Sequence, residues 1–248
     1  MGDAGGQRME GEAGWNGGPE RKKVALMREY VEREDPAAKD VDDLTLRRFL
    51  RARDLDISKG SSLFLKYLKW RKTQVPRGFI SEAEVQHELS QEKLFSQGFD
   101  KTGHPIGVIF GGRHDYSKRN IEEFRRVVVY GLDKLCTRMP VGKEKFVFIG
   151  DLEGWCYANS DIRAYLAALE IMQNYYPERL KKVFMIHVPS MFMKAWKIIY
   201  PFIDDNTKQK IVFVDDKNLK AALLEDIEES QIPDIYGGKL PLVPVQNT

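Results

Sequence analysis

The chain has 248 residues, of which 42% are hydrophobic and 31% charged, and these values are typical of a folded globular protein. Its formal net charge of +2 is too small to indicate a nucleic-acid partner, and we expect none. No apolar run reaches the ~20 residues that a membrane-spanning helix needs, so we expect any membrane contact to be peripheral.

The start of the chain and its cysteines indicate where the protein works. No signal peptide opens the sequence, and its two cysteines are Cys136 and Cys156, so we expect a reducing, cytoplasmic setting. Residues 1–19 are rich in glycine and poor in large apolar side chains, which predicts a disordered tail. Position six lacks the Ser or Thr of a myristoylation signal, so we expect no lipid attachment.

Three helical patterns follow this tail. Apolar residues recur at helical spacing over 20–34, the Asp42-Asp43 pair suits the N-cap of a second helix, and 57–73 carries a wide apolar stripe. Together they predict a small helical domain over residues 20–77. Between positions 21 and 75 there are 15 Lys/Arg and 9 Asp/Glu, an excess that suits an anionic surface or, equally, a solvated helical face.

The rest of the chain alternates between strand and helix patterns. Short runs rich in Val, Ile and Phe are apolar at successive positions, as in strands that are buried on both faces. They predict an α/β domain over residues 78–240 with a mixed, partly parallel sheet, followed by a C-terminal tail at 241–248. The predicted strands are 107–110, 146–149, 183–188 and 211–214, and the predicted helices are 121–137, 160–175 and 190–203.

Catalytic and metal-binding signatures do not occur in the sequence. The glycine-rich phosphate loops, the dinucleotide fingerprint and the nucleophile elbow are all missing, and the four histidines do not have metal-ligand spacings. His187 closes an apolar run and is interpreted as a hydrogen-bonded structural histidine. Asp100 and His104 bracket a polar turn and are not interpreted as an acid–base pair. We expect no enzyme activity, no metal and no cofactor.

Residues 190–203 have two interpretations. As a helix this segment is apolar nearly all round, and only Lys194 and Lys197 interrupt it. It can be a core helix, or it can be a helix that touches a bilayer with its lysines extended toward lipid phosphates. Periodicity favours neither over the other.

The next segment, 204–210, contains a candidate phosphate site. Asp204 and Asp205 are good N-caps, so Thr207 is expected in the first turn of a short helix, three residues before Lys210. A helix N-terminus with a hydroxyl and an ammonium group nearby suits a phosphate. A plain capped helix with a solvated lysine explains the same residues.

Three motifs, in order along the chain, carry a resemblance to a known family. The first is Arg48-Phe-Leu-Arg-Ala-Arg53 with Leu55-Asp56, the second is Asn174-Tyr-Tyr-Pro-Glu-Arg-Leu180, and the third is Ile232-Pro-Asp-Ile-Tyr-Gly-Gly238. They are similar to the signatures of the CRAL-TRIO lipid-transfer proteins, and they span residues 20–240.

The resemblance implies a fold and a binding mode. The expected fold is a helical N-terminal domain plus an α/β domain whose sheet floors a deep hydrophobic pocket. Residues 190–203 then resemble the gate helix that opens at a membrane, which favours the membrane interpretation of that segment. The gate residues expected to contact membrane or cargo are Phe192, Lys194, Trp196, Lys197 and Ile199.

Similarity to the yeast-type phosphatidylinositol transfer branch implies a headgroup site made of Arg53, Glu178, Thr207 and Lys210. The cations would neutralise the phosphodiester, the threonine hydroxyl would donate to it, and the glutamate would orient the cations or accept from inositol. A helix-end ion pair with Arg179 is an alternative role for the glutamate.

Two departures from the family pattern affect the cargo. Asp54 stands where a basic residue often follows the arginine, which removes one phosphate contact. Phe146 and Phe148, expected to line the pocket, replace small hydroxyl residues of members that bind phosphatidylcholine. Phenyl rings cannot donate hydrogen bonds, so the phosphatidylcholine mode is expected to be lost.

The sequence therefore predicts a cytoplasmic, monomeric, non-enzymatic protein that encloses one phospholipid, expected to be phosphatidylinositol, and moves or presents it between membranes through transient peripheral contact. Two alternatives keep the fold. One is a carrier of another apolar molecule of the sterol, tocopherol or retinoid type. The other is a lipid-sensing adaptor that regulates a kinase or a traffic factor.

Overall fold

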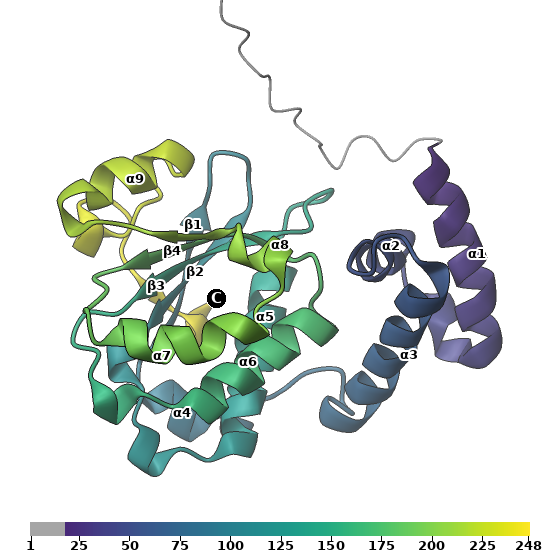
Figure 1. Ribbon diagram of the computed structural model, residues 1–248, viewed down its shortest axis with the longest axis horizontal. Coiled ribbons are helices and arrows are strands. Elements are labelled where there is room, and N and C mark those ends of the chain that lie inside the picture. The colour runs from purple at the N-terminus through teal and green to yellow at the C-terminus, as the bar shows by residue number, and fades with distance from the viewer. Residues whose placement is uncertain (1–17) are drawn as a thin grey trace, which may run out of the picture.

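The computed structural model describes residues 18–248, so the tail predicted at 1–19 lies almost entirely outside the described residues. Figure 1 shows a helical unit at one side and a sheet covered by helices at the other. Within the described part of the chain, none of the helices is both long enough and apolar enough to cross a membrane.

The helical unit forms as the apolar spacing predicts. Its core contains the buried faces of three helices, with Val24, Met27, Phe49 and Phe64 at most 2% exposed. Proline at the first position begins the first helix, and Asp42 and Asp56 cap the next two. These helices are α1 (Pro19–Glu34), α2 (Asp43–Arg51) and α3 (Ile57–Gln74).

The second unit is an α/β domain with a mixed six-stranded sheet in the order β5-β4-β3-β2-β1-β6. Strands β2 to β5 pair parallel with one another, whereas β1 pairs antiparallel with both β2 and β6. The α/β prediction is confirmed. The strands are β1 (Leu94–Phe99), β2 (Pro105–Phe110), β3 (Phe146–Asp151), β4 (Leu180–Ile186), β5 (Ile211–Phe213) and β6 (Val243–Pro244).

Helices cover the sheet on both faces. The crossovers between successive parallel strands lie on one face, and α9 covers the other (Figure 1). Asn120, Asp161 and Asp204 cap α5, α6 and α8 with their side chains. The helices are α4 (Gln86–Ser90), α5 (Ile121–Thr137), α6 (Ile162–Tyr175), α7 (Phe192–Ile199), α8 (Asp205–Lys208) and α9 (Leu219–Asp226).

Two strands are additions to the prediction. Strand β1 carries Ser96, Gln97 and Gly98 in its centre, which hides the apolar pattern, and β6 has two residues. The pairing of β6 with β1 shows that residues 241–248, expected as a tail, pack on the domain. Val245, just after β6, is 3% exposed and belongs to the main core.

Asp100 to His104 form the turn between β1 and β2, as predicted. One carboxylate oxygen of Asp100 accepts from the backbone N–H groups of Thr102 and His104, at 2.9 Å each, and Gly103 has a φ of +86°. Lys181 also contacts this carboxylate. The hydrogen bonds to His104 and Lys181 lower the pKa of Asp100 against the opposing effect of burial. Asp100 and His104 therefore stabilise the turn between the two strands.

The core of the helical unit can be tested with one matched pair of substitutions. Phe64 is fully buried and packs edge-to-face on Phe49, with ring centroids 5.4 Å apart. We expect Phe64→Ala to lower the free energy of unfolding by about 3–5 kcal/mol because it removes a buried ring and leaves a cavity. Urea denaturation followed by circular dichroism measures the loss. The same change at Phe79, which is 58% exposed, is expected to cost less than about 0.5 kcal/mol, and equal losses would contradict the assignment.

Candidate functional site

A cavity of about 920 Å³ lies between the sheet and the crossover helices α5, α6 and α7. Alternate residues of the parallel strands face it, because successive side chains of a strand point to opposite faces. The residues in between pack against α9 on the other face, among them Ile106, Val147, Ile149 and Phe184. The strand residues that line the cavity include Gly107, Ile109, Phe148, Gly150, Val183 and Met185.

The four residues expected to bind a headgroup all line this cavity. Glu178 precedes β4 and Lys210 precedes β5, and the amino ends of parallel strands lie at one edge of the sheet. Thr207 lies in α8, which leads into β5, and Arg53 follows α2 in the helical unit. The fold therefore brings side chains from two units to the amino edge of the cavity.

The ammonium group of Lys210 has no partner among the side chains that the structure describes. Within residues 18–248, no hydrogen bond or ion pair engages this half-buried side chain. Burial lowers the pKa of Lys210, and the positive charge of Lys145 lowers it further, whereas the negative charges of Glu178 and Asp204 oppose the shift. An unpaired, partly desolvated ammonium group at the edge of a cavity suits an anion that can pair with it.

Glu178 has an unusual backbone conformation. Its φ is +58°, in the left-handed region that few non-glycine residues adopt and that costs about 1–2 kcal/mol. The side-chain amide of Asn206 donates to its carboxylate over 3.0 Å, whereas Arg179 donates to the carbonyl of Glu144 over 2.9 Å. The helix-end ion pair that was the alternative role for Glu178 is therefore replaced by these two separate contacts.

Thr207 differs from the expectation of free donors at a helix start. Its backbone N–H donates to one carboxylate oxygen of Asp204 over 2.8 Å, and its hydroxyl donates to the other over 2.7 Å. Donation of this hydroxyl to a phosphate requires that Asp204 release it. The capped-helix explanation accounts for the geometry of Thr207, which nevertheless lies beside the cavity.

Arg53 and Asp54 reach the same edge from the loop between α2 and α3. Among the described residues, the Arg53 guanidinium donates only to the Ala52 carbonyl, over 2.7 Å, which leaves other N–H groups for a ligand. Asp54 has a φ of +54°, a conformation that aspartate adopts more readily than most residues. The replacement thus places a carboxylate where a second cation is common.

Only one of the two phenylalanines on β3 lines the cavity. Phe148 does, and its ring lies over Gly107 of the neighbouring strand, so that a β-carbon added there would be 2.6 Å from the ring. The prediction that Phe146 lines the pocket is wrong: its side chain is fully buried in the main core, packed edge-to-face on Phe148. Phe146 lies at the very start of β3, where core residues cover it.

Helix α7 forms a wall of the cavity with two different faces. Phe192, Trp196 and Ile199 line the cavity. Lys194 and Lys197 are exposed, as are several apolar side chains of the same segment. The inner face of the helix therefore agrees with the core interpretation, and membrane contact by the outer face stays a prediction. The exposed apolar side chains are Met191, Met193, Ile198, Tyr200 and Phe202, with exposed fractions of 37–58%.

Comparison with known proteins identifies the family. The CRAL/TRIO domain profile matches residues 89–238, which is more than half of the chain. A CRAL-TRIO domain-containing protein of Saccharomyces cerevisiae is 30% identical over 240 residues, covering 88% of this chain and 75% of the relative. The chain belongs to the CRAL-TRIO family.

Other CRAL-TRIO proteins are similar over most of this chain. The Sec14 cytosolic factor of Schizosaccharomyces pombe is 32% identical over 80% of this chain and 75% of its own length. The phosphatidylinositol/phosphatidylcholine transfer protein SFH11 of Arabidopsis thaliana is also 32% identical, over 79% of this chain and 57% of its own. These relatives confirm the resemblance to the yeast-type phosphatidylinositol transfer branch.

The fold agrees with a solved CRAL-TRIO structure. The crystal structure of Sfh5 superposes with a TM-score of 0.65 over 82% of each chain, at 17% sequence identity. This likeness confirms the predicted fold class and, at that identity, nothing about the ligand.

His187 and its neighbours are structural in this CRAL-TRIO domain, as predicted. Its Nδ1 lies 2.9 Å from one oxygen of Asp151, and the Tyr236 hydroxyl donates to the other oxygen over 2.6 Å. Asp151, Glu153 and His187 hold ligand-type atoms within 4.8 Å of one another. Because both Asp151 oxygens already accept hydrogen bonds, this cluster holds the C-terminal segment on the end of β3.

A second set of polar residues was missed by the sequence analysis. Lys93 and His114 line the opposite end of the cavity, and Glu88 and Asp161 lie behind them, all four at most 5% exposed. These four residues lie up to 73 positions apart in the sequence, and no two of them belong to the same helix or strand. No local spacing could have indicated this cluster.

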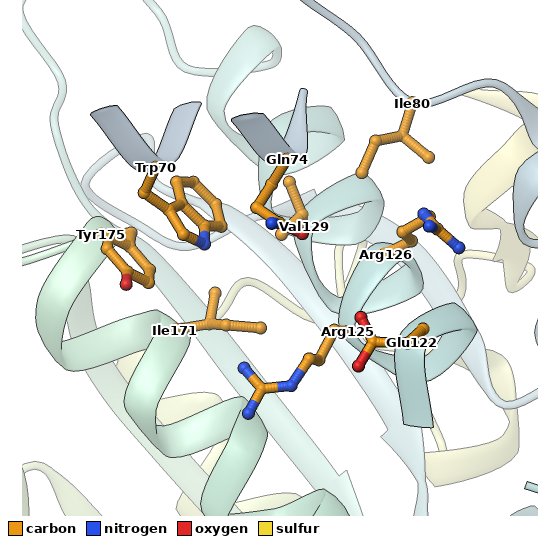
Figure 2. A pocket seen from close by; sticks show the side chains of 9 residues that line it. All are labelled: Trp70, Gln74, Ile80, Glu122, Arg125, Arg126, Val129, Ile171 and Tyr175. Carbon is orange, nitrogen blue, oxygen red and sulfur yellow. The ribbon is translucent and has the colours of Figure 1, made fainter. Parts of the chain in front are cut away.

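A smaller cavity of about 270 Å³ lies outside this site, between the helical unit and the outer surfaces of α5 and α6. Figure 2 shows Trp70 and Tyr175 at one end and the side chains of Arg125 and Arg126 at the other. The two aromatic rings stack with centroids 4.0 Å apart and nearly parallel planes. This stack connects the helical unit to the end of α6, and Glu178 follows three residues later in the sequence.

The fit between Phe148 and Gly107 gives a prediction. We expect Gly107→Ala to lower the free energy of unfolding by about 1–3 kcal/mol, because the new methyl group overlaps the Phe148 ring. In a Phe148→Ala background the same change is expected to cost much less. A double-mutant cycle measured by thermal unfolding gives the coupling. If the two substitutions change the free energy of unfolding additively, the packing of the Phe148 ring does not depend on Gly107.

Proposed function

We propose that this CRAL-TRIO protein encloses a single phospholipid, phosphatidylinositol, and transfers or presents it between membranes. The observation that carries the proposal is the unpaired ammonium group of Lys210 at the edge of a large apolar cavity. Two of the similar proteins are named a cytosolic factor and a phosphatidylinositol/phosphatidylcholine transfer protein. Their names support the cargo class.

The headgroup and the acyl chains would use different parts of the cavity. Arg53 and Lys210 would neutralise the phosphodiester, Glu178 would accept from inositol hydroxyls or orient the cations, and Thr207 would donate once Asp204 releases it. The acyl chains would lie against the apolar strand residues. Burying hundreds of Å² of chain at about 25 cal/mol per Å² favours extraction from a bilayer.

Helix α7 would be the gate through which the lipid passes. It is the wall with an apolar inner face and an exposed outer face that carries both lysines and large apolar side chains. Such a face suits a bilayer surface, with the lysines extended to phosphates. A gate has to open because a closed cavity cannot exchange its cargo.

We propose further that the phosphatidylcholine mode is lost. Phe148 fills the cavity beside Gly107 and cannot donate a hydrogen bond to a choline phosphate. With Phe146 buried in the core, this argument rests on Phe148 alone.

The remaining attributes complete the proposal. The protein is proposed to act in the cytoplasm as a monomer without catalysis, metal or cofactor, with residues 20–77 as the helical domain and 78–240 as the lipid-binding domain. The packing of β6 on β1 extends the lipid-binding domain toward the C-terminus.

The role of Lys210 can be tested against a neighbouring lysine. We expect Lys210→Ala to reduce phosphatidylinositol transfer between vesicles at least tenfold, since it removes the charge-assisted bond to the phosphate. Lys208→Ala is the matched control, because Lys208 does not line the cavity and its ammonium group is already paired with Asp205. Circular dichroism should be unchanged for both. Equal transfer by wild type and Lys210→Ala would place the headgroup elsewhere.

The cargo can be tested by the lipids that the purified protein retains. Mass spectrometry of the wild-type protein is expected to show phosphatidylinositol in about molar proportion and little phosphatidylcholine, because Phe148 excludes the choline phosphate. The Lys210→Ala protein, purified from the same host, is the control and should lose phosphatidylinositol. Phosphatidylcholine as the main bound lipid would overturn the proposed selectivity.

A further inference from the structure

The smaller cavity, between the helical unit and helices α5 and α6, is a pocket with a fixed shape, and we call it the junction pocket. Trp70 lines one end of it, and the stack on Tyr175 holds this ring in place (Figure 2). Side chains that belong to the main core keep their positions without a ligand. The lining residues that belong to this core, all 1–8% exposed, are Ile80, Val129, Ile171 and Tyr175.

The volume of the junction pocket limits what can enter it. Sites for drug-sized molecules typically measure ~300–1,000 Å³, whereas this pocket measures about 270 Å³. It is also much smaller than the cavity of about 920 Å³ over the sheet, so an enclosed phospholipid does not fit. In protein interfaces, a single aromatic or aliphatic side chain that fills a pocket of this kind supplies much of the binding free energy. The junction pocket therefore suits one anchoring side chain of another protein.

Charged side chains lie at the other end of the junction pocket. Arg126 is exposed and has no hydrogen bond or ion pair with any described residue. Arg125 is already paired, because both of its terminal nitrogens donate to one oxygen of Glu170, over 3.1 and 3.2 Å. Glu122 also lines the pocket and opposes the charge of Arg126. The charges of these lining residues and of Glu170 are thus close to balanced.

Two lysines of α3 add positive charge beside the junction pocket. The ammonium group of Lys66 lies 5.8 Å from the centre of the Tyr175 ring. Lys69 follows three residues later, and residues three apart share a face of a helix. Both lysines are exposed, and neither has a carboxylate partner in the described part of the chain. Together with Arg126 they outnumber Glu122, so the surface around the pocket attracts carboxylates.

We infer that the junction pocket is a docking site for an acidic segment of another protein, which inserts one large apolar side chain and places carboxylates against Arg126 and the two lysines of α3. The inference goes beyond the proposed lipid transfer and does not rest on the cargo. No described residue lines both the junction pocket and the cavity over the sheet, so the partner and a lipid occupy separate sites.

The test begins with a selection of peptides. A phage-displayed library of random decapeptides is selected on the immobilised full chain, and we expect the enriched peptides to carry Phe, Trp or Leu within two positions of at least two Asp or Glu residues. An enriched peptide is synthesised with a fluorescent label, and its binding is followed by anisotropy. Replacing its apolar anchor by Ala should weaken binding at least about tenfold. Replacing its acidic residues by amides should weaken binding severalfold and reduce its dependence on salt.

Two variants at exposed positions locate the peptide on the protein. Arg126→Glu reverses the unpaired charge and should weaken peptide binding at least about tenfold. Gln74→Trp adds a large ring to a lining position and should weaken binding severalfold, because the ring competes with the anchor. Arg163→Glu is the matched control, since Arg163 is exposed on α6 and lines neither cavity. All three proteins should have the circular dichroism of the wild type, because exposed substitutions rarely change stability by more than about 0.5 kcal/mol.

The outcomes separate this inference from membrane contact and from lipid transfer. Peptides without acidic residues, equal binding by wild type and both pocket variants, or no enrichment over the unselected library would each overturn the docking site. Vesicles with phosphatidylserine are the rival ligand: if Arg126→Glu weakens their binding and leaves that of the peptide unchanged, the surface contacts membrane instead. Phosphatidylinositol transfer by Arg126→Glu should equal that of wild type, and Lys210→Ala should bind the peptide normally, so either proposal can fail alone.

Discussion

The structure depends on a sheet that packs against helices on one face and borders a cavity on the other. Phe184 and Ile186 of β4 are buried against α9, whereas Val183 and Met185, which alternate with them, are only half-buried because they face the cavity. Apolar surface left in contact with water costs about 25 cal/mol per Å². A lipid that fills the cavity removes that cost, so the binding of cargo and the stability of the domain are coupled.

The parallel strands also place two polar regions at opposite ends of the cavity, one strand length apart. At the amino edge Lys210 has no partner in the described part of the chain, and at the carboxyl edge Lys93 has three partners. An unpaired cation attracts an anion from outside, whereas an ammonium group that already has partners binds a new group only by exchange with one of them. Between the two edges, the strand residues that line the cavity are mainly apolar. The cavity therefore suits long molecules with a polar group at one end.

Local signals predicted most of this fold, and long-range packing decided the rest. Helical periodicity and the caps at Asp42 and Asp204 predicted seven helices within two residues of their observed starts, whereas α4 and α9 were not predicted. Apolar runs predicted β2 to β5. Strand β1 was missed because Ser96 and Gln97 are polar although buried. Alternation placed Phe146 on the same face as Phe148, but it could not show where along β3 the core ends and the cavity begins.

The four residues proposed to bind the headgroup all line the cavity, yet they are not equivalent. Asp204 already accepts the two donors of Thr207 that a phosphate would use. Binding a phosphate there exchanges one anion for another, so the net gain from Thr207 is the small difference between two similar sets of hydrogen bonds. Lys210 gives up no contact with a described residue when it pairs with a phosphate, and the negative charge of the phosphate offsets the burial that lowers the pKa of this lysine. In the proposed headgroup site, the free energy of recognition is therefore expected to be concentrated at Lys210, with Thr207 contributing mainly to the position of the phosphate.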